Sequence, residues 1–332
     1  VAGARGLPAP RFVYANADDY GYALVRLDPA SLAALQNGAI GRVADPFLRA
    51  MLWGTLWDEV RAARMDPARY IRLAMSELPT ETDEQIVPRV LGRLRRAMSA
   101  YLSDVARARL QSEVETFLHD GAANARHPYG IRKAYLDASI GLATSPAGIA
   151  QVDSILDRDS VAGDLLRDPT RWDIVDQLLS RGGPSAERRL VAQRNRDRTP
   201  DGRRRTFVAG VAAPDSAAKR DYFARYFADA NLNEDWASGS LGAFNALEHQ
   251  ALTRRYLRPA LDSLPFIQAN RRIFFLGGWL AAFMNGQSSQ QALDIVRQFL
   301  DQRQDLPADL RRKVLENVDE LERTVAIRKR WN

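Results

Sequence analysis

The chain contains the stretch Pro46-Phe-Leu-Arg-Ala-Met-Leu-Trp-Gly-Thr-Leu-Trp-Asp-Glu-Val-Arg-Ala-Ala-Arg-Met65, whose apolar residues follow a helical period. One stripe has a spacing of four residues and consists of Leu48, Leu52, Leu56 and Val60. Bulky side chains widen this stripe to well over a third of the circumference, namely Phe47, Met51, Trp53 and Trp57. Since a surface helix has a narrower apolar face, we expect this helix to be covered from more than one side.

After Asp28-Pro29, a Pro or Gly that can begin or end a helix recurs at intervals of roughly 15 to 25 residues. Several prolines follow a side chain of the type that caps helices, as in Asp45-Pro46, Asp66-Pro67, Asp168-Pro169 and Thr199-Pro200. Further helix starts are expected at His127-Pro128, Ser145-Pro146, Ala213-Pro214 and Leu306-Pro307. A last helix over about residues 308–328 has a narrow apolar stripe and is expected to cap the array.

This succession of helices with short connections predicts an all-α fold. We expect a HEAT/armadillo-like superhelix of antiparallel helix pairs, in which each pair buries its apolar face on its neighbours. The length of 332 residues also favours an elongated array over one compact core. Because no strict sequence period is found, the repeats would be degenerate and HEAT-like rather than tetratricopeptide. A globular helical bundle in two lobes is the structural alternative.

The beginning of the chain is different and favours β structure. Residues 12–14 and 20–25 are rich in strand formers, and Asn16-Ala17-Asp18-Asp19 between them is typical of a turn. The sequence therefore predicts a short N-terminal β-hairpin within residues 1–28, followed by an α-helical solenoid over residues 29–332. A lone hairpin is marginal in water, so this one should pack on the helices or be the edge of a sheet in a preceding domain.

Composition narrows the partners. The 47 basic and 41 acidic residues give a net charge of +6, but the two signs are mixed along the chain. The densest basic cluster comprises Arg194, Arg196, Arg198, Arg203, Arg204 and Arg205. It contains two aspartates and lacks aromatic residues, so we interpret it as a solvated surface rather than a phosphate-binding patch. No nucleic-acid partner is therefore expected. No membrane partner is expected, since the most apolar stretch, residues 273–284, is too short to span a bilayer.

A catalytic centre is not apparent from the sequence. The absence of cysteine excludes disulfides and thiolate metal sites, and the three histidines, His119, His127 and His249, do not form an H-E-x-x-H zinc motif. Glu115 with His119 and His127 allows a metal site to be drawn, but ordinary surface residues explain the same pattern. The adjacent Glu248 and His249 point to different helical faces and are not a dyad. We therefore assign no catalytic residue and no metal ligand to this chain.

Glycines offer one further pattern that must be weighed as a ligand site. Gly239-Ser240-Leu241-Gly242 superficially resembles a phosphate-binding loop, but it meets neither glycine-rich consensus and follows no predicted strand. We interpret it as a loop that connects two helices.

Specific strings resemble a known family. The first is Arg11-Phe-Val-Tyr-Ala-Asn-Ala-Asp-Asp-Tyr-Gly-Tyr-Ala-Leu-Val-Arg-Leu-Asp28, and the second is residues 48–65. The segment from Tyr70 to Thr82 and the closing stretch from Val318 to Trp331 add to the likeness. Together they resemble the last strands of the β-sandwich and the C-terminal helical domain of aminopeptidase N-like zinc aminopeptidases, the gluzincin group. Within this group, the chain is similar to the C-terminal domain of endoplasmic-reticulum aminopeptidases.

This resemblance implies a role without chemistry of its own. Members of the family hold zinc in a thermolysin-like catalytic domain, and their C-terminal superhelix forms a bowl over the active site that admits peptides. The resemblance thus implies zinc and an upstream catalytic domain outside this chain, with peptides as the substrate. It also implies that residues 1–28 are the remnant of a preceding β-sandwich. No zinc ligand, general base or amine-binding carboxylate can be carried over to a residue of this chain.

Arginine side chains are the candidates for contact with a peptide, because guanidinium grips a terminal carboxylate with two parallel hydrogen bonds. Those beside apolar helical stripes are Arg49, Arg61, Arg271 and Arg272. Ordinary salt bridges would explain the same four residues. The alternative to the aminopeptidase hypothesis is a free-standing α-solenoid that serves as a scaffold for other proteins. Nucleic-acid binding through the basic cluster is a third hypothesis, and it would require a steep dependence on salt.

Overall fold

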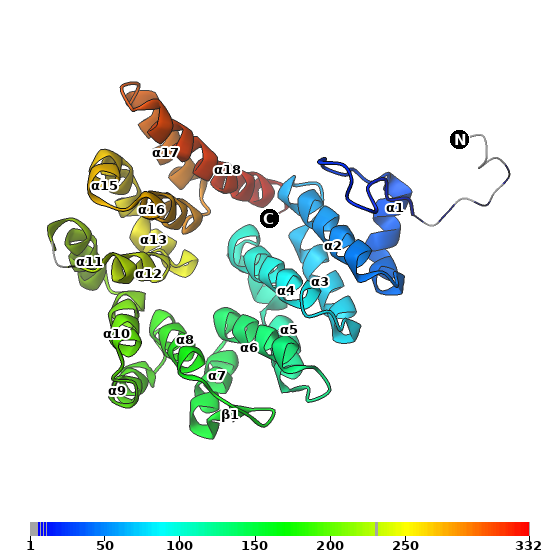
Figure 1. Cartoon of the computed structure of the whole chain (residues 1–332), viewed down its shortest axis with the longest axis horizontal. Coiled ribbons are helices and arrows are strands. Elements are labelled where there is room, and N and C mark those ends of the chain that lie inside the picture. The colour runs from blue at the N-terminus through cyan, green and yellow to red at the C-terminus, as the bar shows by residue number, and fades with distance from the viewer. Residues whose placement is uncertain (1–5, 7, 9, 11, 230–231, 332) are drawn as a thin grey trace.

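The computed structural model describes residues 6, 8, 10, 12–229 and 232–331 and shows an all-α protein (Figure 1). Its α-helices are α1 (Pro29–Ala34), α2 (Pro46–Arg61), α3 (Pro67–Glu77), α4 (Ile86–Arg96), α5 (Asp104–Ala123), α6 (Tyr129–Leu142), α7 (Pro146–Arg158), α8 (Asp168–Ser180), α9 (Ala186–Arg196), α10 (Pro200–Ala212), α11 (Ser216–Ala228), α12 (Glu234–Phe244), α13 (Gln250–Thr253), α14 (Leu257–Asp262), α15 (Leu264–Asn270), α16 (Ile273–Asn285), α17 (Gln290–Gln302) and α18 (Ala308–Trp331). A two-stranded antiparallel sheet of β1 (Ser160–Val161) and β2 (Asp164–Leu165) lies between α7 and α8.

Short helical turns join several of these helices. Two have a widened, π-type backbone, η2 (Leu35–Ala39) and η5 (Ala97–Tyr101), and the others are 3₁₀ turns, namely η3 (Ile40–Arg42), η4 (Leu78–Thr80), η6 (Leu247–His249) and η7 (Arg254–Tyr256).

The predicted helix starts are largely confirmed by their caps. Asp45, Asp66, Ser145 and Thr199 each precede a proline at the start of a helix and accept a hydrogen bond from a backbone amide of its first turn. These bonds satisfy amides that have no partner inside the helix. The start at Asp168 is shifted, because Asp168 is already the first helical residue.

The predicted N-terminal hairpin is wrong for the described residues, because no strand forms between residues 12 and 27. Here the Asn16 side chain closes a turn by bonding both the amide and the carbonyl of Gly21, at 3.0 and 2.9 Å. The Val13 amide donates to Ser31 instead of to a partner strand, at 2.8 Å. A two-stranded ladder without a third strand or a covering face is marginal, which accounts for the missing strands. Residues 1–5, 7, 9 and 11 of the predicted segment lie outside the described residues.

One layer of helices follows the chain and returns to its start. In this layer each helix packs on the next in the order α2, α4, α6, α8, α10, α12, α16 and α18, and α18 packs on α2. Figure 1 shows the C-terminal end of α18 next to α2. We call this closed set of helices the inner layer.

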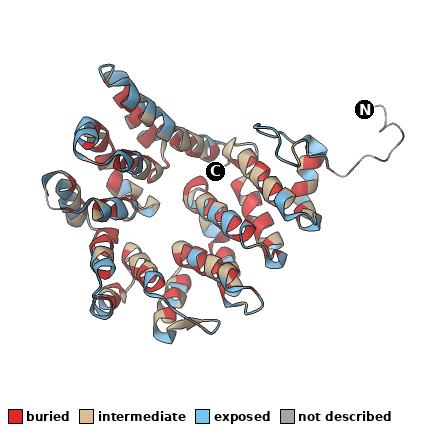
Figure 2. Ribbon diagram, viewed as in Figure 1, coloured by how far each residue is buried: buried red, intermediate tan, exposed pale blue. Residues whose placement is uncertain are grey.

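A second set of helices covers the inner layer. Helix α5 packs on α6, α7 and α9 pack on α8, α11 packs on α10, and α14 and α17 pack on the pair of α16 and α18. Helix α2 is covered by α3, α4 and α18, which explains its wide apolar face, where Leu52, Trp53, Leu56 and Val60 are all buried. Figure 2 shows buried and exposed residues along the helices of both layers. The all-α class is confirmed, and the HEAT-like form of the superhelix stays a prediction.

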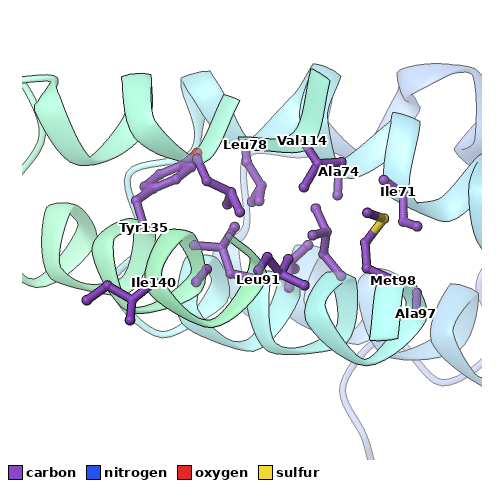
Figure 3. Packing of buried hydrophobic residues seen from close by; sticks show 14 of the residues in the cluster. Ile71, Ala74, Leu78, Leu91, Ala97, Met98, Val114, Tyr135 and Ile140 are labelled. Carbon is purple, nitrogen blue, oxygen red and sulfur yellow. The ribbon is translucent and has the colours of Figure 1, made fainter. Parts of the chain in front are cut away.

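Two hydrophobic cores stabilise the chain. The first comprises residues from Leu35 to Ala186 together with Ala209, Ala212 and Ile327. Figure 3 shows part of it, with Tyr135 at one end, Leu91 in the middle and Ile71 at the other end. The second core extends from Phe207 to Val325. Helix α10 contributes residues to both cores, and so does α18. The two cores are therefore joined at two helices that lie far apart in the sequence.

Polar contacts complete the return of α18 to the N-terminal helices. Glu320 accepts a hydrogen bond from Tyr101 at 2.8 Å and from Arg61 and Arg96 at 3.3 Å each. We call these four residues the Glu320 junction. Further along α18, the Trp331 indole donates to the carbonyl of Ala63 at 3.1 Å. Within the described ranges, no helix combines the length and the apolar character needed to cross a membrane.

Candidate functional site

The acidic residue that the sequence suggested as a metal ligand, Glu115, has a structural role. Glu115 is buried and accepts hydrogen bonds from Gln111, Ser145 and the amides of Thr144 and Ser145, at 2.5 to 3.0 Å. Burial opposes its ionisation, but these donors outweigh it and hold the pKa of Glu115 below its ordinary value. Its role is to tie α5 to the start of α7, which leaves no oxygen for a metal ion.

Two of the three histidines have structural partners, and the third, His119, is half-buried on α5. His127 lies against the ring of Tyr135, with ring centroids 5.9 Å apart, and Nε2 of His249 lies 2.9 Å from the carbonyl of Ser180. Burial lowers the pKa of both imidazoles. In the part of the chain that the structure describes, no three His, Cys, Asp or Glu side chains are grouped so as to hold a metal. The residues present therefore do not fit a zinc site.

Two of the four candidate arginines lie on α2 and are engaged in salt bridges. Arg49 binds both oxygens of Glu81, at 2.8 and 2.9 Å, and also donates to the carbonyls of Val43 and Ala44. Arg61 is part of the Glu320 junction. Twelve residues of helix separate these two arginines by about 18 Å along α2, so they do not form one site.

The other two arginines precede α16, on the opposite side of the molecule from α2 in Figure 1. Arg271 donates to the carbonyl of Tyr226 at 2.7 Å and lies over the ring of Phe275. The side chain of Arg272 is 80% exposed, and its nearest carboxylate oxygen, on Glu234, is 4.0 Å away. Arg272 thus has the most accessible guanidinium of the four, and contact of any of them with a peptide stays a prediction.

Two polar cavities lie on either side of η6, and Glu248 lines both of them. The first, of about 440 Å³, is lined by residues of α5, the start of α7, and Arg181. Arg181 lies 3.3 Å from Glu248, and Ser180 donates to the same carboxylate at 2.8 Å. Burial raises the pKa of Glu248, but Arg181 and Ser180 outweigh this effect and keep it below its ordinary value. Glu248 is therefore an ionised divider between the two cavities.

The second cavity, of about 510 Å³, is lined mainly by the inner layer, with residues from α4, α6, α8 and α12. Its polar wall on α8 consists of Asp173, Asp176, Gln177 and Ser180. Sequence reasoning missed this wall, although the spacing of three, four and seven residues places the four side chains on one helical face. The periodic polar stripe in an otherwise buried helix was the available signal.

The stretch Gly239-Ser240-Leu241-Gly242 lies inside α12, so its interpretation as a connecting loop is wrong. Ser240 is buried and bonds the hydroxyl of Tyr226 at 2.7 Å. Close packing explains Gly239, since a Cβ there would lie 3.1 Å from Arg204, whereas a Cβ at Gly242 would meet nothing within 4 Å. Gly242 lines the second cavity.

A buried lysine stands close to this end of α12. Lys219 is fully buried and donates to the carbonyls of Val211, Ala243 and Phe244, at 2.6, 3.1 and 2.9 Å. These carbonyls belong to the last turns of α10 and α12, where the helix dipole favours a cation. Burial lowers the pKa of Lys219 to about 8. Lys219 thus joins two helices of the inner layer.

The basic cluster of residues 194–205 forms ion pairs on the surface. Arg204 pairs with Asp201 at 2.7 Å, Arg205 with Asp173 at 2.9 Å and Arg196 with Asp168 at 3.4 Å. These distances agree with the interpretation as a solvated, salt-bridged surface.

Comparison with known proteins now defines the class. The family model described as ERAP1-like C-terminal domain matches residues 12–323, and the chain belongs to this family. Among curated proteins, the chain is similar to Aminopeptidase N of Streptomyces lividans, with 26% identity over 269 residues. That match covers 80% of this chain and 31% of the relative, so the chain spans less than a third of the relative's length. The family resemblance predicted from the sequence is confirmed.

Proposed function

We propose that this chain is the non-catalytic C-terminal domain of a zinc aminopeptidase, and that it covers the active site and shapes the chamber for peptide substrates. The family match over residues 12–323 is the observation that carries this proposal. Zinc would be held by an upstream catalytic domain, since the described residues of this chain do not fit it. The parent protein would remove N-terminal residues from peptides.

The closed inner layer supports the proposed role in the substrate chamber. A continuous wall of helices excludes folded proteins and limits the access of bulk water to chemistry on a neighbouring domain. Polar cavities in the wall offer hydrogen-bonding groups to a peptide backbone. Arg272 is the arginine best placed to meet a peptide carboxylate, because its guanidinium is exposed and only loosely paired.

The first experiment compares the full reading frame with this chain alone. The gene upstream of Val1 should encode H-E-x-x-H and a second zinc-binding glutamate, and the full-length protein should hydrolyse aminoacyl anilides in a zinc-dependent way. This chain alone should have no peptidase activity. A start codon immediately before Val1, or hydrolysis by the isolated chain, would contradict the proposal and favour the free-standing scaffold or an unrecognised catalytic centre.

The second experiment separates the chamber from the chemistry. In the full-length protein, Arg272→Ala should raise KM for peptides of eight to twelve residues and leave a small aminoacyl anilide unchanged. Arg312→Ala is the matched control, since Arg312 is also exposed and pairs only with Glu316 one helical turn away. Equal effects of the two substitutions on long peptides would refute the role of Arg272.

A further inference from the structure

Asp176 stands apart from the other acidic residues of the second cavity. One of its carboxylate oxygens, Oδ1, is shielded from solvent and accepts no hydrogen bond from the described residues. The carboxyl group is carried by α8 in the middle of the inner layer. A buried carboxylate oxygen without a donor is costly, and such a group is stabilised when a cation or a hydrogen-bond donor reaches it.

The neighbouring acids are already paired. Arg205 holds Asp173 at 2.9 Å, Lys133 holds Asp137 at 2.5 Å, and Arg181 holds Glu248 at 3.3 Å. Arg205 and Arg204 also act on Asp176 through their charge, but no described residue forms an ion pair or a hydrogen bond with the Asp176 carboxylate. Asp176 is the acidic side chain of the cavity that is left to bind something else.

The remaining lining of the cavity is compatible with an extended organic ligand. Small residues form much of it, including Gly141, Ala212 and Gly242. Arg95 on α4 also lines the cavity, is exposed, and has no hydrogen-bonding partner among the described residues. Helices α4 and α8 both pack on α6, so Arg95 and Asp176 lie on either side of α6. A free guanidinium donates to carbonyl oxygens, whereas Asp176 requires a donor.

We propose that the second cavity binds a primary ammonium group on an alkyl chain, the side chain of a lysine within a peptide, with Asp176 as its acceptor and Arg95 on a peptide carbonyl. The ammonium donates to the Asp176 carboxylate through the oxygen that is not shielded from solvent, and its charge balances the one acid of the wall that forms no ion pair among the described residues. A peptide as the source of the lysine rests on the proposed function of the chamber. Binding of the ammonium itself depends only on this chain.

The test is calorimetric titration of this chain at pH 8.5 with neutral-ended acetyl-Gly-Lys-Gly-amide. The same tripeptide with norleucine in place of lysine keeps the alkyl chain and removes the charge. We expect binding of the lysine peptide at least tenfold tighter than that of the norleucine peptide. Cadaverine, a free diamine, should bind more weakly than the lysine peptide because it offers Arg95 no carbonyl. Equal affinity for lysine and norleucine would overturn the proposal, and tighter binding of cadaverine would overturn the peptide as the source.

Two variants attribute the binding to the cavity. Asp176→Asn removes the charge without changing the shape, should fold because it removes a buried carboxylate, and should weaken the lysine peptide at least tenfold. Asp120→Asn is the control, since Asp120 is an exposed aspartate on α5 outside the cavity. Wild-type affinity in Asp176→Asn, or an equal loss in Asp120→Asn, would refute the assignment.

The pH dependence of the affinity gives an independent measurement. Asp176 must be ionised to accept the ammonium, so affinity should rise at least threefold from pH 6 to pH 8.5, and Asp176→Asn should abolish this rise. The charged groups around the carboxyl are Asp173, Asp137, Glu248, Arg95, Arg204 and Arg205. These readouts use no peptidase activity, so failure here leaves the aminopeptidase proposal standing. Absence of activity in the full-length protein would leave ammonium binding standing.

Discussion

Replacing Glu320 by glutamine should loosen the closure of the inner layer. This carboxylate accepts hydrogen bonds from three side chains that belong to the N-terminal helices, Arg61, Arg96 and Tyr101. Glutamine has nearly the same shape and keeps one acceptor oxygen, so the substitution removes charge without leaving a cavity. The effect is therefore electrostatic and can be built up from the individual contacts.

The magnitude follows from the exposure and the geometry of those contacts. The bond from Tyr101 is short and made to a charged acceptor, and making the acceptor neutral costs about 1 kcal/mol. The pairs with Arg61 and Arg96 are at 3.3 Å and partly open to solvent, so each contributes about 0.5 kcal/mol. Glu320→Gln should therefore lower the free energy of unfolding by about 2 kcal/mol. Glu316→Gln on the same helix breaks only an exposed pair at 3.6 Å and should cost less than about 0.5 kcal/mol.

Urea denaturation followed by tryptophan fluorescence measures the loss, and hydrogen exchange locates it. In Glu320→Gln, amides of residues 96–102 and 318–331 should exchange faster, because opening of the junction exposes both sides of it. Amides of α5 and α6, in the centre of the first core, should be unaffected. A loss no larger than that of Glu316→Gln, or faster exchange spread evenly over the chain, would refute the view of the junction as a local closing contact.

Four further substitutions test other parts of the chain. Lys219→Met should cost about 3 kcal/mol in urea denaturation, because it leaves three helix-end carbonyls without their donor; unchanged stability would show that water replaces the ammonium. Gly121→Ala should lower the melting temperature, since the new Cβ would lie 2.3 Å from the buried ring of Tyr135, whereas Gly92→Ala, with open space around it, should raise it. Burial raises the pKa of Asp176 to about 7, above its unfolded value, so its carboxyl costs stability as pH rises through about 7. Asp176→Asn should therefore gain about 4 kcal/mol over the wild type at pH 8.5 and nothing at pH 4, and a pH-independent difference would contradict this.

The elements that the sequence predicted are those decided by neighbouring residues. An aspartate followed by a proline marks the start of a helix through contacts within the first turn. Asp45 and Asp66 both cap a helix in this way. The last helix was expected from residue 308 and begins there, because its apolar stripe and basic end are local properties. Neighbouring residues could not decide whether Glu115 holds a metal, because only the fold shows that Ser145 and Thr144 use its oxygens.

The elements that were missed depend on distant partners. The strand formers at residues 12–25 need a neighbouring sheet to become strands, and the described structure offers them Ser31 and Thr55 instead. The glycines of α12 resemble a loop until α10 is packed against them. The second cavity forms only when four helices are brought together, so the sequence did not indicate that Asp176 lines a cavity.

The closure of the inner layer links these observations to the proposed chamber. Among the described residues, α10 and α18 place buried side chains in both hydrophobic cores, and Ala243 of α12 packs against both, so the two cores are joined at few places. At α10 the connection is apolar, and near Ala212 it borders the second cavity. At α18 the connection includes the buried Ile327, the bonds of Arg328 to the carbonyls of Ala100 and Leu102, and Glu320, whose contacts are polar and partly exposed and therefore the least costly to open. A change in the wall should begin at the Glu320 junction, and Glu320→Gln in the full-length protein should alter turnover of long peptides before it alters that of a small anilide.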